Sequence, residues 1–328
     1  MKRVFAGTSL ALLCSGLLLA SLAQAQGGPA AFPSRPVRIV VPFAAGGATD
    51  IVARLVGAKL GEVWRQAVVV DNRPGASGAI GSEYVARSPA DGYTLVLGGA
   101  TTHSAGPAVN PKLPYDNIKD FAAVSLITTF PNMLVVHPSV PARTLAEFIA
   151  FLKANPNKYN FASTGSGGSV HLAAELFMMM TGTRMTHVPY KGSGQALADL
   201  LAGTVQCEFD NMTTVFPHVQ SGKLRALGVA GLERSSAAPS VPAIAETLPG
   251  FEANSYVGLL MPAGSPAAIV RQFADETRRV VNQPDVRQKL QELGATPVGS
   301  SPEEFAEFLK TDTERWRQVV KSAGIKLE

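Results

Sequence analysis

The sequence predicts an α/β protein built as about two domains. Short apolar runs typical of strands alternate along the chain with longer runs in which apolar residues recur every three or four positions. This alternation indicates parallel sheets flanked by helices. The chain has 328 residues, which is more than one small hydrophobic core normally organises. Glycine-containing turns follow several of the predicted strands, and open α/β sheets bind ligands beyond the carboxyl ends of their strands.

Residues 1–25 have the organisation of a signal peptide. Lys2 and Arg3 precede an apolar run that ends at Ala23-Gln24-Ala25, a small-x-small cleavage pattern. A transmembrane anchor is the alternative, but the uninterrupted apolar stretch is short for a span and its end suits cleavage better. No later run approaches the ~20 apolar residues of a membrane helix. We therefore expect a protein exported to the periplasm.

Charge and cysteine content exclude several classes of function. The chain carries 29 basic and 25 acidic side chains, a net charge of +4, and loss of Lys2 and Arg3 lowers that charge further. Acidic residues interleave with the basic ones, so no nucleic-acid-binding patch is expected. Of the two cysteines only Cys207 follows the leader; it lies in a strand pattern and is expected to be buried and inert. No metal-ligand spacing occurs, and we expect neither a metal nor a cofactor.

The predicted secondary structure follows from periodicity and capping. Strands are predicted at 37–41, 67–70, 94–97, 122–127, 133–136, 159–163, 204–209 and 224–229. An amphipathic helix is predicted after Asp50. Thr144 with Glu147, and Ser301 with Glu304, make capping boxes that begin two further helices.

Two glycine-rich turns carry the strongest functional signal. "FAAGGATD" runs from Phe43 to Asp50, and "STGSGGSVH" carries residues 163–171 from a strand into a helix. Glycines let a ligand approach the backbone, and the first N–H groups of a helix attract anions. Asp50 is expected to cap its helix. Asp210 and Asn211 follow the strand at 204–209 and are candidates for the same cleft.

Nucleotide-binding and hydrolase patterns are incomplete. No Gly-Lys-Ser/Thr occurs, and the G-x-G-x-x-G pattern would need glycine where Val170 stands. The nucleophile pattern G-x-S-x-G is approached around Ser77 but ends in Ala79, and the turn at Ser166 lacks the first glycine. An exported serine hydrolase using Ser77 or Ser166 remains the alternative from another class.

The segments together resemble the substrate-binding proteins of tripartite tricarboxylate transporters, the Bug-type extracytoplasmic receptors. Matching stretches include "PSRPVRIVVPFAAGGATDIVARLVGAKL", "VVVDNRPGASGAIGSEYVARSPADGYTL", "ASTGSGGSVHLAAELF" and "HVPYKGSGQALADLLAGTV". The resemblance covers nearly all of the chain after the leader. It implies a two-lobed flytrap fold with two crossings, lobe 1 holding 33–127 and 255–328 and lobe 2 holding 128–254.

The resemblance also implies a ligand and a site. One ligand carboxylate would be held by backbone N–H groups and waters at Ala45-Gly46-Gly47 and at Thr164-Gly165-Ser166-Gly167. Thr101, Thr102 and His103 would meet the distal part of a dicarboxylate, tricarboxylate, acidic amino acid or aromatic acid. The implied protein is a monomer without a catalytic step that delivers its ligand to membrane permease subunits; a receptor feeding a sensor kinase is the third interpretation.

Overall fold

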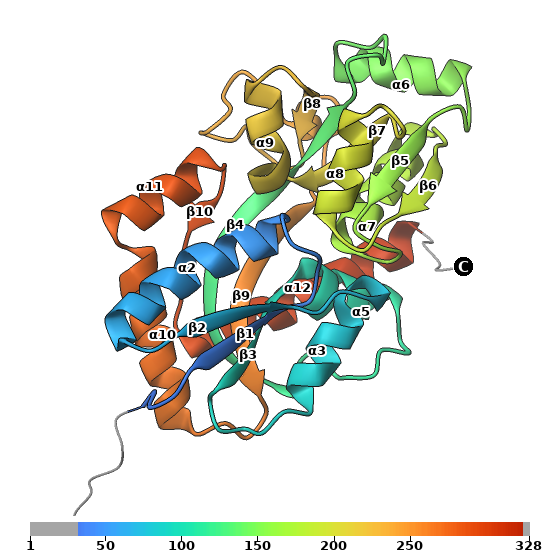
Figure 1. Ribbon diagram of the computed structural model, residues 1–328. Helices are drawn as coiled ribbons and strands as arrows, with labels where there is room; N and C mark the ends of the chain where they lie inside the picture. The colour runs from blue at the N-terminus through green and yellow to red at the C-terminus, as the bar shows by residue number, and fades with distance from the viewer. Residues whose placement is uncertain (1–31, 324–328) are drawn as a thin grey trace, which may run out of the picture. The chain divides into compact units, whose positions relative to one another are not determined.

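One long strand, β4 (Phe121–Val136), runs through both sheets of the protein, and the chain returns from the second sheet to the first in β9 (Asn254–Pro262). The computed structural model describes residues 32–323, and the predicted signal peptide lies outside them. Strand β4 pairs with β9 through its first part, up to Pro131. From Asn132 onward it pairs with β7 (Cys207–Asn211) and β8 (Arg225–Val229) instead. Figure 1 shows β4 running from the part that holds β1 to β3 into the part that holds β5 to β8.

The strand order is β2-β1-β3-β9-β4-β7-β5-β6, with β8 and β10 also paired to β4. We call the sheet around β1 the sheet of lobe 1 and the sheet around β5 the sheet of lobe 2. The remaining strands are β1 (Val37–Val41), β2 (Val68–Asn72), β3 (Thr94–Gly99), β5 (Asn160–Ser163), β6 (Thr186–Pro189) and β10 (Thr296–Pro297). Pairing is parallel for β1 with β2 and β3, and for β5 with β6 and β7.

The helices follow the strands as predicted for an α/β chain. They are α2 (Ala48–Trp64), α3 (Ala79–Ala86), α4 (Ala100–His103), α5 (Ala105–Val109), α6 (Leu145–Ala154), α7 (Ser169–Thr181), α8 (Ser193–Leu201), α9 (Met212–Gln220), α10 (Ala267–Val281), α11 (Pro284–Glu292) and α12 (Pro302–Ala323), with 3₁₀ turns at Ala76–Gly78 and Ile244–Glu246. Both predicted capping boxes are confirmed. Thr144 Oγ1 accepts from the Glu147 N–H at 3.2 Å, and Ser301 Oγ accepts from the Glu304 N–H at 3.1 Å.

Two of the predicted strands are merged in the structure. The strands predicted at 122–127 and 133–136 are one continuous strand, β4, because the chain stays extended through Pro131 where it passes from one sheet to the other. Every pairing of β4 and β9 is antiparallel, unlike the rest of the sheets. The predicted lobe ranges themselves stay a prediction.

The two sheets pack against separate buried apolar clusters. Val40, Val96 and Leu260 belong to a cluster on the sheet of lobe 1. In lobe 2 one cluster contains Leu134 and Phe209, and another on the opposite face contains Val135 and Ala162. Cys207 is fully buried, as predicted, and burial raises the pKa of its thiol. The fold thus places the carboxyl ends of β1, β3, β5 and β7, each followed by a helix, around the crossing strands.

Candidate functional site

The first glycine turn connects β1 to α2. Gly47 is the residue before the helix, and Asp50 is the third residue within it, so the predicted capping position of Asp50 is wrong. Asp50 instead reaches backward: its Oδ2 accepts from the Gly46 N–H at 3.0 Å. Gly46 has φ of 91°, a left-handed conformation that favours glycine. The turn is therefore held by a buried carboxylate on the helix that follows it.

Asp50 is satisfied by the protein itself. Its Oδ1 accepts from Asn72 Nδ2 at 3.0 Å, and Arg54 Nε donates to Oδ2 at 3.0 Å. Burial opposes ionisation of Asp50, but the hydrogen bonds from Arg54, Gly46 and Asn72 hold its pKa below the ordinary value of 3.8. Asn72 also donates to the carbonyl oxygen of Phe43 at 3.0 Å. Asp50 thus holds the turn in place, and Arg54 forms its ion pair with Asp50.

The second glycine turn connects β5 to α7. Gly165 and Gly167 have φ of 137° and 74°. The Gly167 N–H donates to His171 Nδ1 at 3.0 Å, which requires that nitrogen to be unprotonated. His171 stacks on His187 with a centroid separation of 3.9 Å, and Ser163 Oγ lies 2.6 Å from His187 Nε2. Burial is the largest cause that lowers the pKa of His187, to about 4.

The segment after β3 has two different environments. Thr101 Oγ1 lies 3.0 Å from Ser169 Oγ and accepts from the Ser169 N–H at 3.1 Å. Thr102 and His103 are turned into the core of lobe 1, where His103 Nδ1 lies 2.8 Å from Thr102 Oγ1 and the ring packs on Phe121. Burial lowers the pKa of His103 to about 3, so this imidazole is neutral.

A cavity of about 30 Å³ lies where these turns meet. Its lining includes the first residues of four helices of nine residues or more: α2, α7, α8 and, through the N-cap Asn211, α9. Three of the four N-cap residues are glycines, and the side chain of the fourth, Asn211, makes no capping hydrogen bond. The short α4 adds Gly99, Ala100 and Thr101. The start of a helix carries partial positive charge, so the convergence of these starts favours an anion.

Neutral donors also line the cavity. Hydroxyls come from Thr49, Thr164, Ser193 and Ser255, and Asn211 supplies an amide. Neither lysine, arginine nor histidine lines this cavity in the described part of the chain. Within residues 32–323 no group of three or more His, Cys, Asp or Glu side chains could hold a metal ion. The arrangement can solvate a carboxylate with dipoles, without an opposing cation.

The structure brings part of the predicted set onto this lining. Phe43, Gly47, Asp50, Thr101, Thr164 and Asn211 border the cavity. The other predicted site residues do not line the cavity: Ala45, Gly46, Thr102, His103, Gly165, Ser166, Gly167 and Asp210. Sequence reasoning missed Thr49, Ser169, Ser193 and Ser255. Ser193 had a usable signal, because "YKGSGQ" is a third glycine turn that leads into a helix.

The lobes are closed on one another. Ser77 Oγ of lobe 1 donates to the Ser166 carbonyl of lobe 2 at 2.7 Å, and the Ala44 N–H donates to the Lys191 carbonyl at 3.4 Å. A cavity of about 30 Å³ has room for roughly one or two water molecules. A dicarboxylate does not fit in it, so ligand entry requires the cleft to open.

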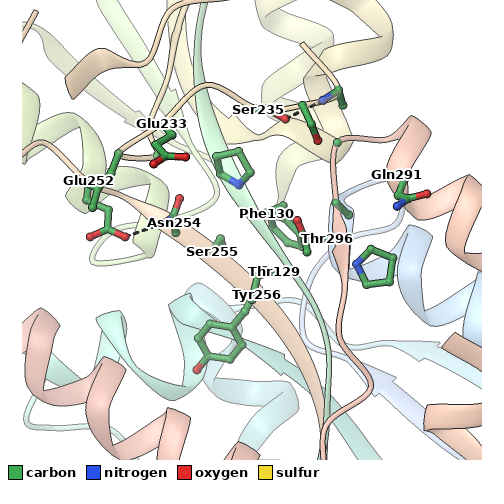
Figure 2. Close-up of a pocket in the computed structure, with 18 of the residues that line it drawn as sticks. Thr129, Phe130, Glu233, Ser235, Glu252, Asn254, Ser255, Tyr256, Gln291 and Thr296 are labelled. Atoms are coloured by element: carbon green, nitrogen blue, oxygen red, sulfur yellow. Dashed lines mark hydrogen bonds between the residues drawn. The ribbon is translucent and has the colours of Figure 1, made fainter. Parts of the chain in front are cut away.

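A larger cavity of about 680 Å³ borders the same crossing strands (Figure 2). It shares Phe130, Ser255 and Tyr256 with the small cavity but is otherwise lined by the loop 231–237 and by parts of α11, β10 and α12. None of the glycine turns reaches it. The candidate ligand site is therefore the small cavity, where the helix starts converge.

Comparison with known proteins identifies the family. The profile of the tripartite tricarboxylate transporter family receptor matches residues 52–325. The chain belongs to this receptor family. Protein BugT of Bordetella pertussis is 37% identical over 90% of this chain and 92% of its own length. Among solved structures, R. palustris Rpa4515 with adipate has a TM-score of 0.88 and 38% identity, covering 90% of this chain and 99% of that one.

A further solved relative is MatC (Rpa3494) from Rhodopseudomonas palustris with bound malate. It has a TM-score of 0.85 and 35% identity, and the match covers 88% of this chain and 100% of that one. The solved structure of periplasmic binding protein BugD, with a TM-score of 0.87 and 30% identity over 90% of this chain and 100% of that one, confirms the predicted periplasmic-binding-protein fold. Because the family consists of solute receptors, the hydrolase interpretation is dropped; in the structure the Ser77 hydroxyl donates to a backbone carbonyl. Among the described helices, none combines the length and apolar character that a membrane crossing requires.

Proposed function

We propose that this receptor captures a small carboxylate between its lobes in the periplasm and delivers it to the permease of a tripartite tricarboxylate-type transporter. The observation that carries the proposal is the convergence of four helix starts on one cavity without a cationic side chain. Solved relatives with adipate and with malate support a carboxylate as the ligand. Family membership supports the transporter as the destination.

The energetics of such a site suit reversible capture. Hydrogen bonds to a charged group contribute about 1.5–3 kcal/mol each, compared with about 1 kcal/mol for neutral pairs. A few of them, with burial of the ligand stem, reach the roughly −8 kcal/mol of micromolar binding after association costs. Because the ligand is held by neutral hydrogen-bond donors and not by an arginine, it can also be released at the permease.

The test is calorimetric binding of adipate and malate, each compared with its diamide as a matched neutral control. The proposal predicts that at least one dicarboxylate binds, that its diamide does not, and that ligand at a hundredfold its Kd stabilises the protein by about 2.7 kcal/mol. Binding of a diamide as tightly as its acid would contradict the assignment of an anion site. Loss of labelled-ligand uptake in cells that lack the receptor gene tests the transporter partner.

A further inference from the structure

Two carboxyl groups lie buried on one face of β7. Glu208 pairs in register with Val135 and Asp210 with Met133, and both carboxyl residues have no exposed surface. Residues two apart on a strand point to the same side of the sheet. Both side chains therefore face the layer formed by α8 and α9 and lie beside one another.

The surroundings of Glu208 are apolar. Val135, Ala162 and Met133 of the neighbouring strands belong to the same buried cluster as Leu200 of α8 and Val215 of α9. Within residues 32–323, Glu208 Oε1 and Oε2 and Asp210 Oδ2 have no hydrogen-bond partner. A charged carboxylate without a partner is expensive to bury, whereas a protonated one is far less so.

Other titratable groups near this face do not neutralise the pair. Tyr190 donates its hydroxyl proton to Asp199 Oδ2 of α8 at 2.6 Å, and burial together with that bond raises the pKa of Tyr190 to about 12. Lys191 is exposed. His171 and His187 stack on Phe161, which neighbours Ala162 along β5 and so points to the opposite face. From α9, the polar neighbours Thr213 and Thr214 are neutral.

Both carboxyl groups have raised pKa values. Burial, followed by the negative charge of Asp210, raises the pKa of Glu208 well above its usual value of 4.5. Burial raises the pKa of Asp210 to about 7, against hydrogen bonds from Asn211 and Ser193 that lower it. Burial thus favours the protonated form of Glu208, and Asp210 exchanges its proton near neutral pH.

Asp210 is one hydrogen bond away from the ligand cavity. Its Oδ1 accepts from Ser193 Oγ at 3.0 Å and from the Asn211 N–H at 2.7 Å. Ser193 and Asn211 both line the cavity. While Asp210 is ionised, the single hydroxyl proton of Ser193 is directed away from the cavity and toward the carboxylate. Ser193 then presents lone pairs, which repel an anionic ligand.

We propose that Glu208 and Asp210 form a proton-binding site that couples capture of the ligand carboxylate to uptake of a proton by Asp210. The coupling deepens the proposed function and rests on it. A proton from solvent binds the Asp210 carboxylate, the resulting acid no longer requires the Ser193 proton, and Ser193 Oγ donates to the ligand instead. The ligand charge in turn favours the protonated aspartate, so affinity falls as pH rises.

The test is isothermal titration calorimetry with adipate and with malate in buffers of different ionisation enthalpy. Both ligand carboxyls are ionised between about pH 6.5 and 8.5, so they contribute no titration of their own. The wild type is expected to take up protons, approaching one per ligand near pH 8, with affinity falling by up to about tenfold per pH unit above 7. Asp210→Asn is expected to bind without proton uptake, because its amide resembles the protonated acid. Glu208→Gln, which keeps the titrating aspartate, is expected to retain uptake.

The outcomes separate this inference from the proposed function. Binding by the wild type without proton uptake overturns the inference and leaves the receptor function standing, as does unchanged uptake in Asp210→Asn. Binding of neither dicarboxylate overturns the receptor assignment and the inference together. If Asp210→Asn does not fold, the ligand-induced infrared difference spectrum of the wild type decides: a gained band of a protonated carboxyl supports the inference, and its absence overturns it.

Discussion

Thr101→Val tests whether closure of the lobes contributes to affinity. Thr101 Oγ1 makes two contacts with Ser169 across the cleft, one to its hydroxyl at 3.0 Å and one from its N–H at 3.1 Å. Valine preserves the shape of threonine but removes both bonds. In the open protein the polar groups of Ser169 can reach water, so the loss applies to a liganded state in which the lobes close far enough around the ligand to make both contacts again.

The expected loss of affinity follows from the number of bonds. Two hydrogen bonds at about 0.5–1.5 kcal/mol each amount to about 1–3 kcal/mol, or roughly a 5- to 150-fold increase in Kd. Titration calorimetry with adipate or malate measures it. Ser77→Ala removes one solvent-accessible cross-lobe bond and is expected to weaken binding less.

Thr181→Val is the matched control. Thr181 Oγ1 donates to the Phe177 carbonyl at 2.7 Å within α7, away from the cleft, so the same substitution should lower the melting temperature and leave Kd unchanged. The reasoning is refuted if Thr101→Val binds within twofold of the wild type. It is equally refuted if the unliganded Thr101→Val protein loses as much stability as the liganded one.

Further predictions concern the turn and the buried carboxyls. Gly47→Val should abolish dicarboxylate binding, measured by calorimetry, with little change in melting temperature, because the valine side chain would fill the cavity beside Ser193. Unchanged affinity would exclude this turn from the site. Asp50→Asn should destabilise by about 1–3 kcal/mol in urea unfolding at neutral pH. Because the folded pKa of Asp50 lies below 3.8, that stabilisation is present above this value and should disappear as pH falls through the lowered pKa. Glu208 has a raised folded pKa, so its own contribution to stability declines as pH rises above 4.5. Glu208→Gln should therefore gain stability relative to the wild type by at most about 1.4 kcal/mol per pH unit, and parallel pH profiles of the two proteins would contradict this.

The sequence predicted the local elements better than the long strands. The strand at 37–41 is β1 to the residue, since its run is uninterrupted. β4 was divided because Pro131 and two threonines break its apolar pattern. β9 was not among the predicted strands. It contains Gly258, which weakens a strand pattern, yet a Cβ there would collide with the Phe305 ring.

Site residues could be predicted only where they lie in a glycine turn that directly follows a predicted strand. Gly47 and Thr164 follow strands within glycine turns and do line the cavity. His103 looked like a ligand contact from its position after β3, but the direction of its side chain depends on core packing with Phe121. Ser255 lines the cavity from β9, a strand that the sequence pattern did not reveal.

A structure of the protein with adipate or malate tests the central claim most directly. The account predicts one ligand carboxylate within hydrogen-bond distance, directly or through one water, of N–H groups at the starts of α2 and α7. A carboxylate paired instead with an arginine, or a ligand seated in the larger cavity beside α11 and α12, would contradict it.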